Sequence, residues 1–468
     1  MLDRRVPRWR KPQAGPIIAA AATRITAAIT SVAYAFISTV YWMRFAGLAR
    51  TFRHPRTIAL TSSGLDAYCA RVDAISATSA EALLVAPAGA PHVWWLPAPE
   101  PPPPHSRIIK ISDALMPKFP ILDVPYPACQ QGFLRISCAI VFPQTGVVMP
   151  EIGVALRNDF VGWTADHRQL PGFVDFDGDA LIARERAFYP MRRIRQPVIN
   201  ICHAYHRNYV HWVTDCLPFL LPWLTLLQQG RLAVLMPPLL GAWQRRTLEL
   251  LGVPASAVIE APEPSVLCDD MIVPGLRIAN GPNPRICIPQ PAPDVRETIR
   301  ILRCAARHET GIEQPEYIYV SRRGLKSFRT MSNEEDVEWA MSRLGFAVIH
   351  PDELTFDQQV TYFARARVVA GPHGAGLNNA VFAPTECLVV DIFPDTWSPM
   401  WMLRETQLFG QHYLPVAYPA DPALSQPVHF RNAIIARSNV YRVPPDDFAA
   451  TLVGVMQRMG IDRPAPMR

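Results

Sequence analysis

The stretch VVAGPHGAGLNNAVFAPTECLVVDI, residues 368–392, decides how the second half of this chain is interpreted. Two apolar runs, Val368–Ala370 and Leu388–Ile392, predict buried strands. Between them, the turn GPHGAG at 371–376 leads into a short predicted helix over Ala375–Phe382. Three glycines in six residues let the backbone approach a ligand, and a helix N-terminus offers N–H groups to a phosphate. The pattern is neither a Walker A motif nor G-x-G-x-x-G, so alone it fits a ligand-free turn equally well.

The sequence before this turn repeats the alternation of strand and helix. Strands are predicted at 317–320 and 346–349, and helices at 332–345 and 355–366. Ser332 with Glu335 and Thr355 with Gln358 are capping-box pairs, and Gly345 ends the first helix. Such alternation predicts a parallel, doubly wound sheet that binds ligands at the carboxyl ends of its strands.

Basic residues directly follow the first of these strands. After residues 317–320 come Arg322 and Arg323, and then Lys326 and Arg329. The carboxyl ends of parallel strands meet at one edge of a sheet, so this basic run and the glycine turn should lie together. Clustered cations bind phosphate oxygens, and arginine can do so with two hydrogen bonds. A solvated basic loop is the alternative interpretation.

A further constellation is RNYVHWVTDCLPFL, residues 207–220. On a helix, His211 and Asp215 are four residues apart and share one face. Their neighbours are strongly apolar, and a carboxylate or imidazole in such surroundings can act as a general base. The same spacing also fits a purely structural hydrogen bond between His211 and Asp215.

Two groups of residues contain metal-ligand types, and neither has a suitable spacing. The first group comprises His203, His206, His211, Cys202 and Cys216. Its spacing matches no common zinc signature. The second, VDFDGD at residues 174–179, lacks the glutamate that completes a calcium-binding loop. The sequence therefore predicts no metal site and no cofactor.

The composition excludes several classes of protein. Of 468 residues, 49% are apolar, which excludes a wholly disordered chain, and 48 prolines argue against a coiled coil. The net charge of +6 is uneven, because residues 1–56 carry ten Arg and Lys and one acid, whereas the remainder is slightly acidic. The folded body is therefore not expected to bind nucleic acid, and residues 1–56 are expected to contact an anionic membrane surface.

The basic tail contains a charge-free run from Ile25 to Met43. Its length suits a membrane span, but Ser and Thr dilute its hydrophobicity, so a surface helix and a targeting segment are alternatives. Nine cysteines with scattered spacing predict reduced thiols. We therefore expect a cytoplasmic protein that associates with, or is anchored to, the inner membrane.

Two proline-rich stretches, at 97–104 and 283–294, divide the chain. The predicted divisions are a basic tail with a candidate membrane helix at 1–56, a proline-rich connecting segment at 57–107, an N-terminal lobe at 108–290, a C-terminal lobe at 291–400 and a return segment at 401–468.

Taken in order, three of these stretches resemble glycosyltransferase family 61, which includes bacterial capsular-polysaccharide-type enzymes and eukaryotic N-acetylglucosaminyl- and xylosyltransferases. The stretches are N-Y-x-H-W-x-x-D-x-L-P from Asn208 to Pro218, SRR with FRTMSNEED between Ser321 and Asp336, and the block from Phe346 through GPHGAGLNN to Leu388. Together they cover roughly residues 200–395. The sequence departs from the family at Asn378, where relatives often have Thr, and at Phe219, where relatives often have a basic residue.

The resemblance implies an α/β fold of the GT-B type, with two Rossmann-like lobes and an active cleft between them. The lobe at 108–290 would hold the acceptor and the lobe at 291–400 the sugar nucleotide. Residues 401–468 would return toward the acceptor lobe. Enzymes that it resembles invert the anomeric centre and need no metal.

The implied activity is transfer of a sugar from a nucleotide-diphosphate donor to a hydroxyl of a glycan or polysaccharide acceptor. Asp215 or His211 would take the acceptor proton, and the sequence leaves that choice open. The expected substrate-binding residues are Arg322, Lys326, Arg329, His373, Gly374, Ala375, Gly376, Asn379 and Asn208, with Glu334 and Asn379 closer to supporting positions. Two other functions stay open: a non-catalytic carbohydrate- or nucleotide-binding protein of the same fold, and a metal-dependent hydrolase that uses the histidine cluster.

Overall fold

The computed structural model describes the chain in segments. The described residues are 57–63, 65–87, 90–96, 107–109, 111, 132–151, 154–156, 173–177, 180–184, 188, 191–203, 206–237, 241–275, 278–280, 287–289, 294–306, 314–325, 329–396, 400–425, 427–430, 433–437 and 439–462. The predicted basic tail with its membrane helix, the stretch 97–104 and Lys326 lie outside these residues.

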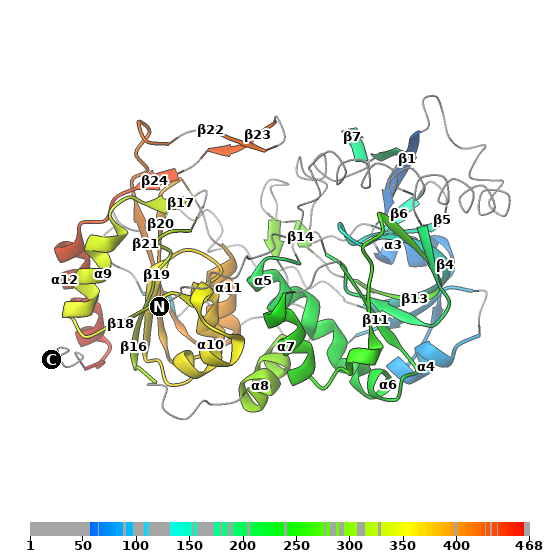
Figure 1. The fold of residues 1–468 in the computed structure, drawn as a ribbon, viewed down its shortest axis with the longest axis horizontal. Coiled ribbons are helices and arrows are strands. Elements are labelled where there is room, and N and C mark those ends of the chain that lie inside the picture. The colour runs from blue at the N-terminus through cyan, green and yellow to red at the C-terminus, as the bar shows by residue number, and fades with distance from the viewer. Residues whose placement is uncertain are drawn as a thin grey trace, which may run out of the picture.

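The fold is α/β and is built on two principal sheets, which lie beside each other in Figure 1 with α5, α7 and α8 between them. The large sheet contains β1 (Thr57–Ser63), β2 (Ile75–Ser76), β3 (His92–Trp95), β4 (Gly132–Phe142), β5 (Val147–Glu151), β6 (Val154–Leu156), β7 (Phe173–Asp177), β8 (Ala180–Arg184), β9 (Met191–Ile194), β10 (Val198–Asn200), β11 (Ala233–Met236), β12 (Val258–Glu260) and β13 (Ser265–Gly275). Its strands β12, β11, β10 and β13 run parallel, whereas β13 pairs antiparallel with the long β4. The Rossmann-like pattern expected for 108–290 is therefore confined to one part of this sheet.

The second sheet is wholly parallel, as the strand and helix alternation predicted. Its order is β18 (Ala347–Ile349), β16 (Tyr317–Val320), β19 (Val368–Pro372), β20 (Leu388–Pro394) and β21 (His412–Tyr418). We call it the parallel sheet. The apolar runs that predicted its central strands are buried because helices cover both faces, as parallel sheets require.

Helices and small ribbons complete the described fold. The helices are α3 (Leu65–Arg71), α4 (Ala80–Val85), α5 (Tyr209–His211), α6 (Leu224–Gln228), α7 (Ala242–Leu250), α8 (Val295–Ala305), α9 (Glu334–Arg343), α10 (Phe356–Phe363), α11 (Met400–Leu408) and α12 (Pro445–Arg458), with 3-10 turns η6 (Ala255–Ala257), η7 (Pro351–Glu353) and η8 (Leu377–Phe382). The ribbons pair β14 (Ile278–Asn280) with β15 (Cys287–Pro289), β17 (Arg329–Met331) with β24 (Asn439–Tyr441), and β22 (Pro427–Phe430) with β23 (Ala433–Arg437). A single apolar core cluster reaches from Phe133 of the large sheet to Val369 of the parallel sheet.

One of the two predicted capping boxes is confirmed. Thr355 Oγ1 accepts from the Gln358 N–H at 3.2 Å, and Gln358 Oε1 accepts from the Thr355 N–H at 2.9 Å. The other prediction is wrong, because α9 begins after Asn333 and that cap makes no side-chain capping bond. The Asn333 amide instead exchanges two hydrogen bonds with the backbone of Val443, at 2.7 and 3.1 Å. Tertiary pairing with the C-terminal segment therefore replaces the local cap.

The segment Tyr209–Gln228 contains the His211–Asp215 pair that the sequence placed on a helix, and it changes its helix type three times. After α5 comes a π-helix, η4 (Trp212–Cys216), then a 3-10 helix, η5 (Leu217–Trp223), and then α6. Two prolines inside η5 lack the N–H that an α-helix needs. Among the described residues, this segment alone is long and apolar enough to cross a membrane, and 72% of its apolar window is buried inside the fold.

The segments that flank the two sheets differ from their predicted roles. Residues 57–107, predicted to connect, contribute β1, β2 and β3 to the large sheet. At the predicted start of the N-terminal lobe, Ile109 N–H donates to Tyr413 O at 2.8 Å, so the chain joins the edge of the parallel sheet there. The described part of the predicted return segment includes β21, which extends the parallel sheet, and α12, which packs against α9. The predicted boundaries between divisions remain predictions.

Candidate active site

Two carboxylates from α9 hold the loop that follows β16. Ser321 Oγ donates to Glu338 Oε1 at 2.5 Å, and the Arg322 N–H donates to Glu334 Oε1 at 2.6 Å. Glu334, Glu338 and Ser321 are buried. Glu334 and Glu338 therefore fix the start of this loop at Ser321 and Arg322, whereas Arg323, Gly324 and Leu325 are exposed.

Arg322 reaches the glycine turn at the adjacent strand end. Its Nη1 donates to the main-chain oxygen of His373 at 3.0 Å, directly after β19. A Cβ on Gly374 would collide with this guanidinium group. The structure therefore brings together the basic run and the glycine turn, as the topology of the parallel strands predicted.

Arg329 stands beside Arg322 although it belongs to β17, outside the parallel sheet. Burial and the charge of Arg322 lower the pKa of Arg329 to about 10, and burial also lowers the pKa of Arg322. Asp391 and Tyr441 favour the charged form of both arginines, yet the net shift stays downward. Two partly buried cations that disfavour each other form a site to which an anion would bind favourably.

The two arginines line one cavity of about 330 Å³. Its other lining residues include Arg323, Arg442, Asn333 and Glu334. We call it the arginine cavity. Burial raises the pKa of the Glu334 carboxyl to about 7, so this acid carries only part of a negative charge near neutral pH. The lining also includes the acids Glu335 and Asp336. Four arginines therefore outnumber two acids and the partly charged Glu334, so the lining is polar with a net positive charge.

The glycines of GPHGAG serve contacts within the protein. A Cβ on Gly371 would collide with the backbone oxygen of Val320, and a Cβ on Gly376 would press on Pro351. Close packing of strands and side chains explains them, rather than the direct approach of a ligand that the sequence suggested. The helix that follows is a 3-10 helix of six residues, η8, so its dipole adds little to anion binding.

Asn379 and Asn208 lie at structural positions. Asn379 is fully buried, accepts from the Tyr209 hydroxyl at 2.6 Å and donates to Gln359 Oε1 at 2.8 Å. Asn208 caps α5 by accepting from the Val210 N–H at 3.1 Å. The Tyr209–Asn379 bond joins the segment after β10 to the turn after β19, which fixes the two predicted site segments to each other.

His211 and Asp215 form the predicted pair. His211 Nδ1 lies 2.8 Å from Asp215 Oδ2, and the π-helical turn keeps both side chains on one side. The side chain of His211 is 17% exposed and that of Asp215 only 1%. Thr214 Oγ1 also lies 3.2 Å from Asp215 Oδ1, and burial raises the pKa of Asp215. His211 therefore faces outward, and Asp215 stands behind it.

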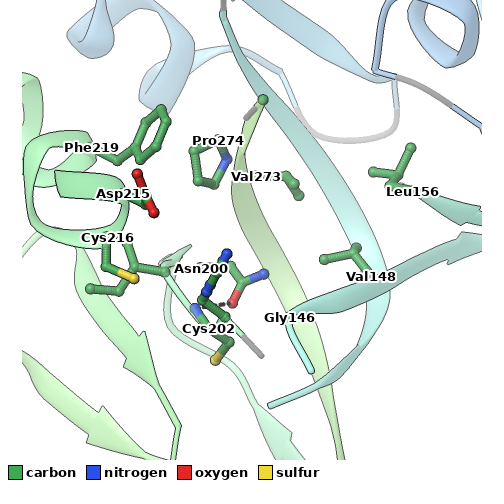
Figure 2. Close-up of a pocket in the computed structure, with 13 residues that line it drawn as sticks. Gly146, Val148, Leu156, Asn200, Cys202, Asp215, Cys216, Phe219, Val273 and Pro274 are labelled. Atoms are coloured by element: carbon green, nitrogen blue, oxygen red, sulfur yellow. Dashed lines mark hydrogen bonds between the residues drawn. The ribbon is translucent and has the colours of Figure 1, made fainter. Parts of the chain in front are cut away.

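The space behind Asp215 is small. Figure 2 shows its carboxylate between Phe219 and Pro274, with Asn200 and Cys202 across the pocket. The cavity volume there is about 30 Å³, which admits a water molecule but no sugar ring. A substrate must therefore approach the pair from the side of His211.

Two buried acids in this region, Asp391 and Glu405, were not predicted from the sequence. Asp391, with no exposed surface, lies 3.0 Å from His373 Nδ1 through its Oδ2. Glu405 is buried nearby, and burial and the charge of Asp215 raise its pKa well above the ordinary range. With its amide turned to donate, Asn378 Nδ2 lies 2.8 Å from Glu405 Oε1. A charged residue inside the apolar run LVVDIF was the signal that could have identified Asp391.

Glu405 connects the two halves of the site. Its helix, α11, also carries Trp401, whose ring centroid lies 5.1 Å from that of His211. The charges of Asp215 and Asp391 both act on Glu405. Glu405 is therefore within electrostatic range of both Asp215 and Asp391.

The metal alternative gains no support from the positions of its candidate ligands. Within the described segments, no three His, Cys, Asp or Glu side chains are grouped as a metal site would require. His203 and His211 have ring centroids 5.7 Å apart, and the His206 ring bonds to the backbone oxygen of His203. Asp179 of the aspartate turn lies outside the described residues.

Comparisons with known proteins agree with the resemblance. A 103-residue part of the chain is 37% identical to a beta-1,2-xylosyltransferase, XAX1, of Oryza sativa subsp. japonica. The match covers 21% of this chain and 16% of the relative, so the chain spans about a sixth of that protein's length. Residues 209–390, which include His211, Asp215, Arg322, Arg329 and His373, match the family model Glycosyltransferase 61.

Proposed function

We propose that the protein is a glycosyltransferase that moves a sugar from a nucleotide-diphosphate donor to a hydroxyl of a glycan or polysaccharide. The observation that carries the proposal is the pair Arg322 and Arg329, two partly buried cations on one cavity at the carboxyl ends of parallel strands. The match of residues 209–390 to Glycosyltransferase 61 supports the same chemistry. The two sheets would form the two lobes of a GT-B enzyme.

The arginine cavity would hold the donor diphosphate. Arginine forks bind two phosphate oxygens at once, and a bound dianion would relieve the repulsion between Arg322 and Arg329. The cationic groups would then stabilise the charge that develops on the diphosphate as the sugar departs. Since side-chain cations supply this stabilisation, we propose that transfer proceeds without a metal.

His211 would be the general base, with Asp215 as its partner. His211 is the more exposed of the two, and the cavity behind Asp215 has no room for a sugar. The acceptor hydroxyl would give its proton to Nε2 of His211 while its oxygen attacks the anomeric carbon. The bond from that carbon to the diphosphate oxygen breaks, its electron pair leaves on the diphosphate, and the configuration inverts. Asp215 would stabilise the imidazolium that forms.

A panel of nucleotide sugars tests this proposal. Thermal-shift measurements identify the donor, since a ligand at 100 times its dissociation constant adds about 2.7 kcal/mol of stability. Pentose donors come first because the matched relative is a xylosyltransferase. Product analysis of the transferred sugar then follows, with EDTA present throughout. Transfer with an inverted anomeric centre supports the proposal, whereas a donor that binds and is never consumed indicates a binding protein.

A further inference from the structure

His373 is held by a second histidine and carboxylate pair, on the donor side of the site. Its Nδ1 lies 3.1 and 3.0 Å from the two carboxylate oxygens of Asp391. The hydroxyl of Tyr413 donates to Asp391 Oδ2 at 2.9 Å. The three residues come from the neighbouring strands β19, β20 and β21 or directly follow them. Three adjacent strands of the parallel sheet therefore build this pair.

Asp391 is placed where a negative charge needs cationic neighbours. It has no exposed surface, and an unpaired buried carboxylate is strongly unfavourable. Its charge acts on Arg322 and Arg329, and its oxygens face the His373 ring. Burial and Asp391 raise the pKa of Tyr413 far above its usual value, so this phenol keeps its proton and remains a donor. Asp391 is thus the counter-charge behind the cationic side of the site.

His373 is tied to the arginine cavity through its own backbone. Its carbonyl oxygen accepts the Arg322 hydrogen bond at 3.0 Å, so ring and guanidinium are fixed to the same residue. Its side chain is 12% exposed, whereas that of Asp391 is fully enclosed. With Nδ1 held by the carboxylate, Nε2 lies on the opposite edge of the imidazole ring.

We propose, building on the proposed function, that His373 is a catalytic residue whose imidazolium Nε2–H donates to the departing diphosphate, and that Asp391 is its positioning residue, assisted by Tyr413. His373 adds a third positive group to Arg322 and Arg329. It gives a hydrogen bond and keeps its proton. The electron pair of the broken carbon–oxygen bond stays on the diphosphate, and the acceptor proton goes to His211. The site thus uses two histidine–carboxylate pairs, one for each end of the reaction.

Steady-state transfer kinetics with His373→Gln, Asp391→Asn and Tyr413→Phe test this assignment. His373→Gln should lower kcat about 100-fold with KM changed less than about threefold, since the bond strengthens as the diphosphate leaves. Asp391→Asn should give a similar loss, and the double variant should be no worse than either single variant. Tyr413→Phe should lose less than about tenfold. A merely structural role would lower apparent kcat through a smaller fraction of active enzyme and would also lower the melting temperature. We therefore express kcat per binding-competent enzyme, counted by calorimetric titration of a nucleoside diphosphate, and expect the loss to persist at an unchanged melting temperature.

His412→Gln is the matched control, because His412 also pairs with a carboxylate, Glu386 at 2.9 Å, on the same strand as Tyr413. It should leave kcat unchanged. If Asp391→Asn fails to fold, His373→Gln and Tyr413→Phe still decide the matter. Full kcat in His373→Gln, in an enzyme that transfers sugar, overturns the assignment while the proposed function stands. Absence of donor binding and transfer in wild type and control alike overturns both.

Discussion

Arg322 occupies the space that a side chain on Gly374 would need. The guanidinium lies against the turn after β19, where its Nη1 donates to the carbonyl of His373 at 3.0 Å. A residue from one strand end is thereby locked to the neighbouring strand end, 51 residues further along the chain. The absence of a side chain on Gly374 therefore leaves room for the Arg322 guanidinium beside the turn.

Gly374→Ala should therefore weaken diphosphate binding while the fold survives. The new methyl group displaces the tip of a flexible side chain, and the misplaced guanidinium should raise the dissociation constant of a nucleoside diphosphate roughly 10- to 100-fold. Calorimetric titration measures this change. Gly454→Ala, inside α12 with an ordinary contact to Arg458, is the control and should leave binding unaltered.

Gly371→Ala, in contrast, should lower the stability of the fold. Its Cβ would meet the backbone oxygen of Val320, which cannot move as a side-chain tip can. We expect a loss of about 1–3 kcal/mol in the free energy of unfolding, measured by urea denaturation. A Gly371→Ala protein as stable as wild type would contradict the packing explanation of this turn.

Arg322→Ala should lower kcat about 10²- to 10³-fold, the usual effect of losing one anion-stabilising donor. Initial rates at saturating donor measure it. Arg343→Ala is the matched control, because Arg343 is the last residue of α9, lies 4.6 Å from the Trp339 ring and does not line the arginine cavity. Equal loss in both variants would mean that general charge, rather than this position, matters.

Asp215→Asn should reduce kcat roughly 10³- to 10⁴-fold, because the amide no longer orients His211 or stabilises its imidazolium. Thr214→Val removes one donor to Asp215 and should cost about tenfold or less. Burial raises the pKa of Asp215. Protonation of the proposed base removes its acceptor, so kcat/KM should fall on the acid side. If the acid limb of the kcat/KM profile were unchanged in Asp215→Asn, this pair would be excluded as the base.

Glu334 should make stability depend on pH in a defined direction. Burial raises its pKa from 4.5 to about 7, so the folded protein binds a proton that the unfolded chain has released between those values. The stabilising contribution is complete below pH 4.5 and disappears as pH rises through 7, a difference of about 3 kcal/mol. Glu334→Gln should lack this decline. Urea unfolding of wild type and Glu334→Gln at pH 5 and pH 8 measures the difference. If both proteins lost the same free energy of unfolding between these pH values, Glu334 would not be the group responsible.

The sequence predicted the parallel sheet well because its strands are short apolar runs between strong turn signals. Thr355 with Gln358 formed the expected capping box, and the four-residue spacing of His211 and Asp215 placed them in contact. Predictions from the local sequence failed where a side chain bonds to a segment far away in the chain. Asn333 caps nothing because it bonds to Val443, 110 residues away. The prolines within η5 divide a predicted helix into three helix types.

The missed site residues share one feature, which is that their role depends on burial rather than on local pattern. Asp391 lies inside an apolar strand and Glu405 inside a helix that is buried over most of its length, so neither belongs to a recognisable motif. Only the assembled fold shows that Tyr413 and His373 face Asp391. A charge inside an apolar run marks Asp391 as unusual, but its partners from other strands become known only in the assembled fold.

We propose that Arg322 and Arg329 together bind the diphosphate of the donor. Calorimetric titration of a nucleoside diphosphate into wild type, Arg322→Ala, Arg329→Ala and the control Arg343→Ala tests it most directly. We expect Arg322→Ala and Arg329→Ala each to bind the nucleoside diphosphate at least about tenfold more weakly than wild type. The affinity of Arg343→Ala should be unchanged, and the melting temperatures of all four proteins should be similar. Equal affinity in wild type and both cavity variants would contradict it.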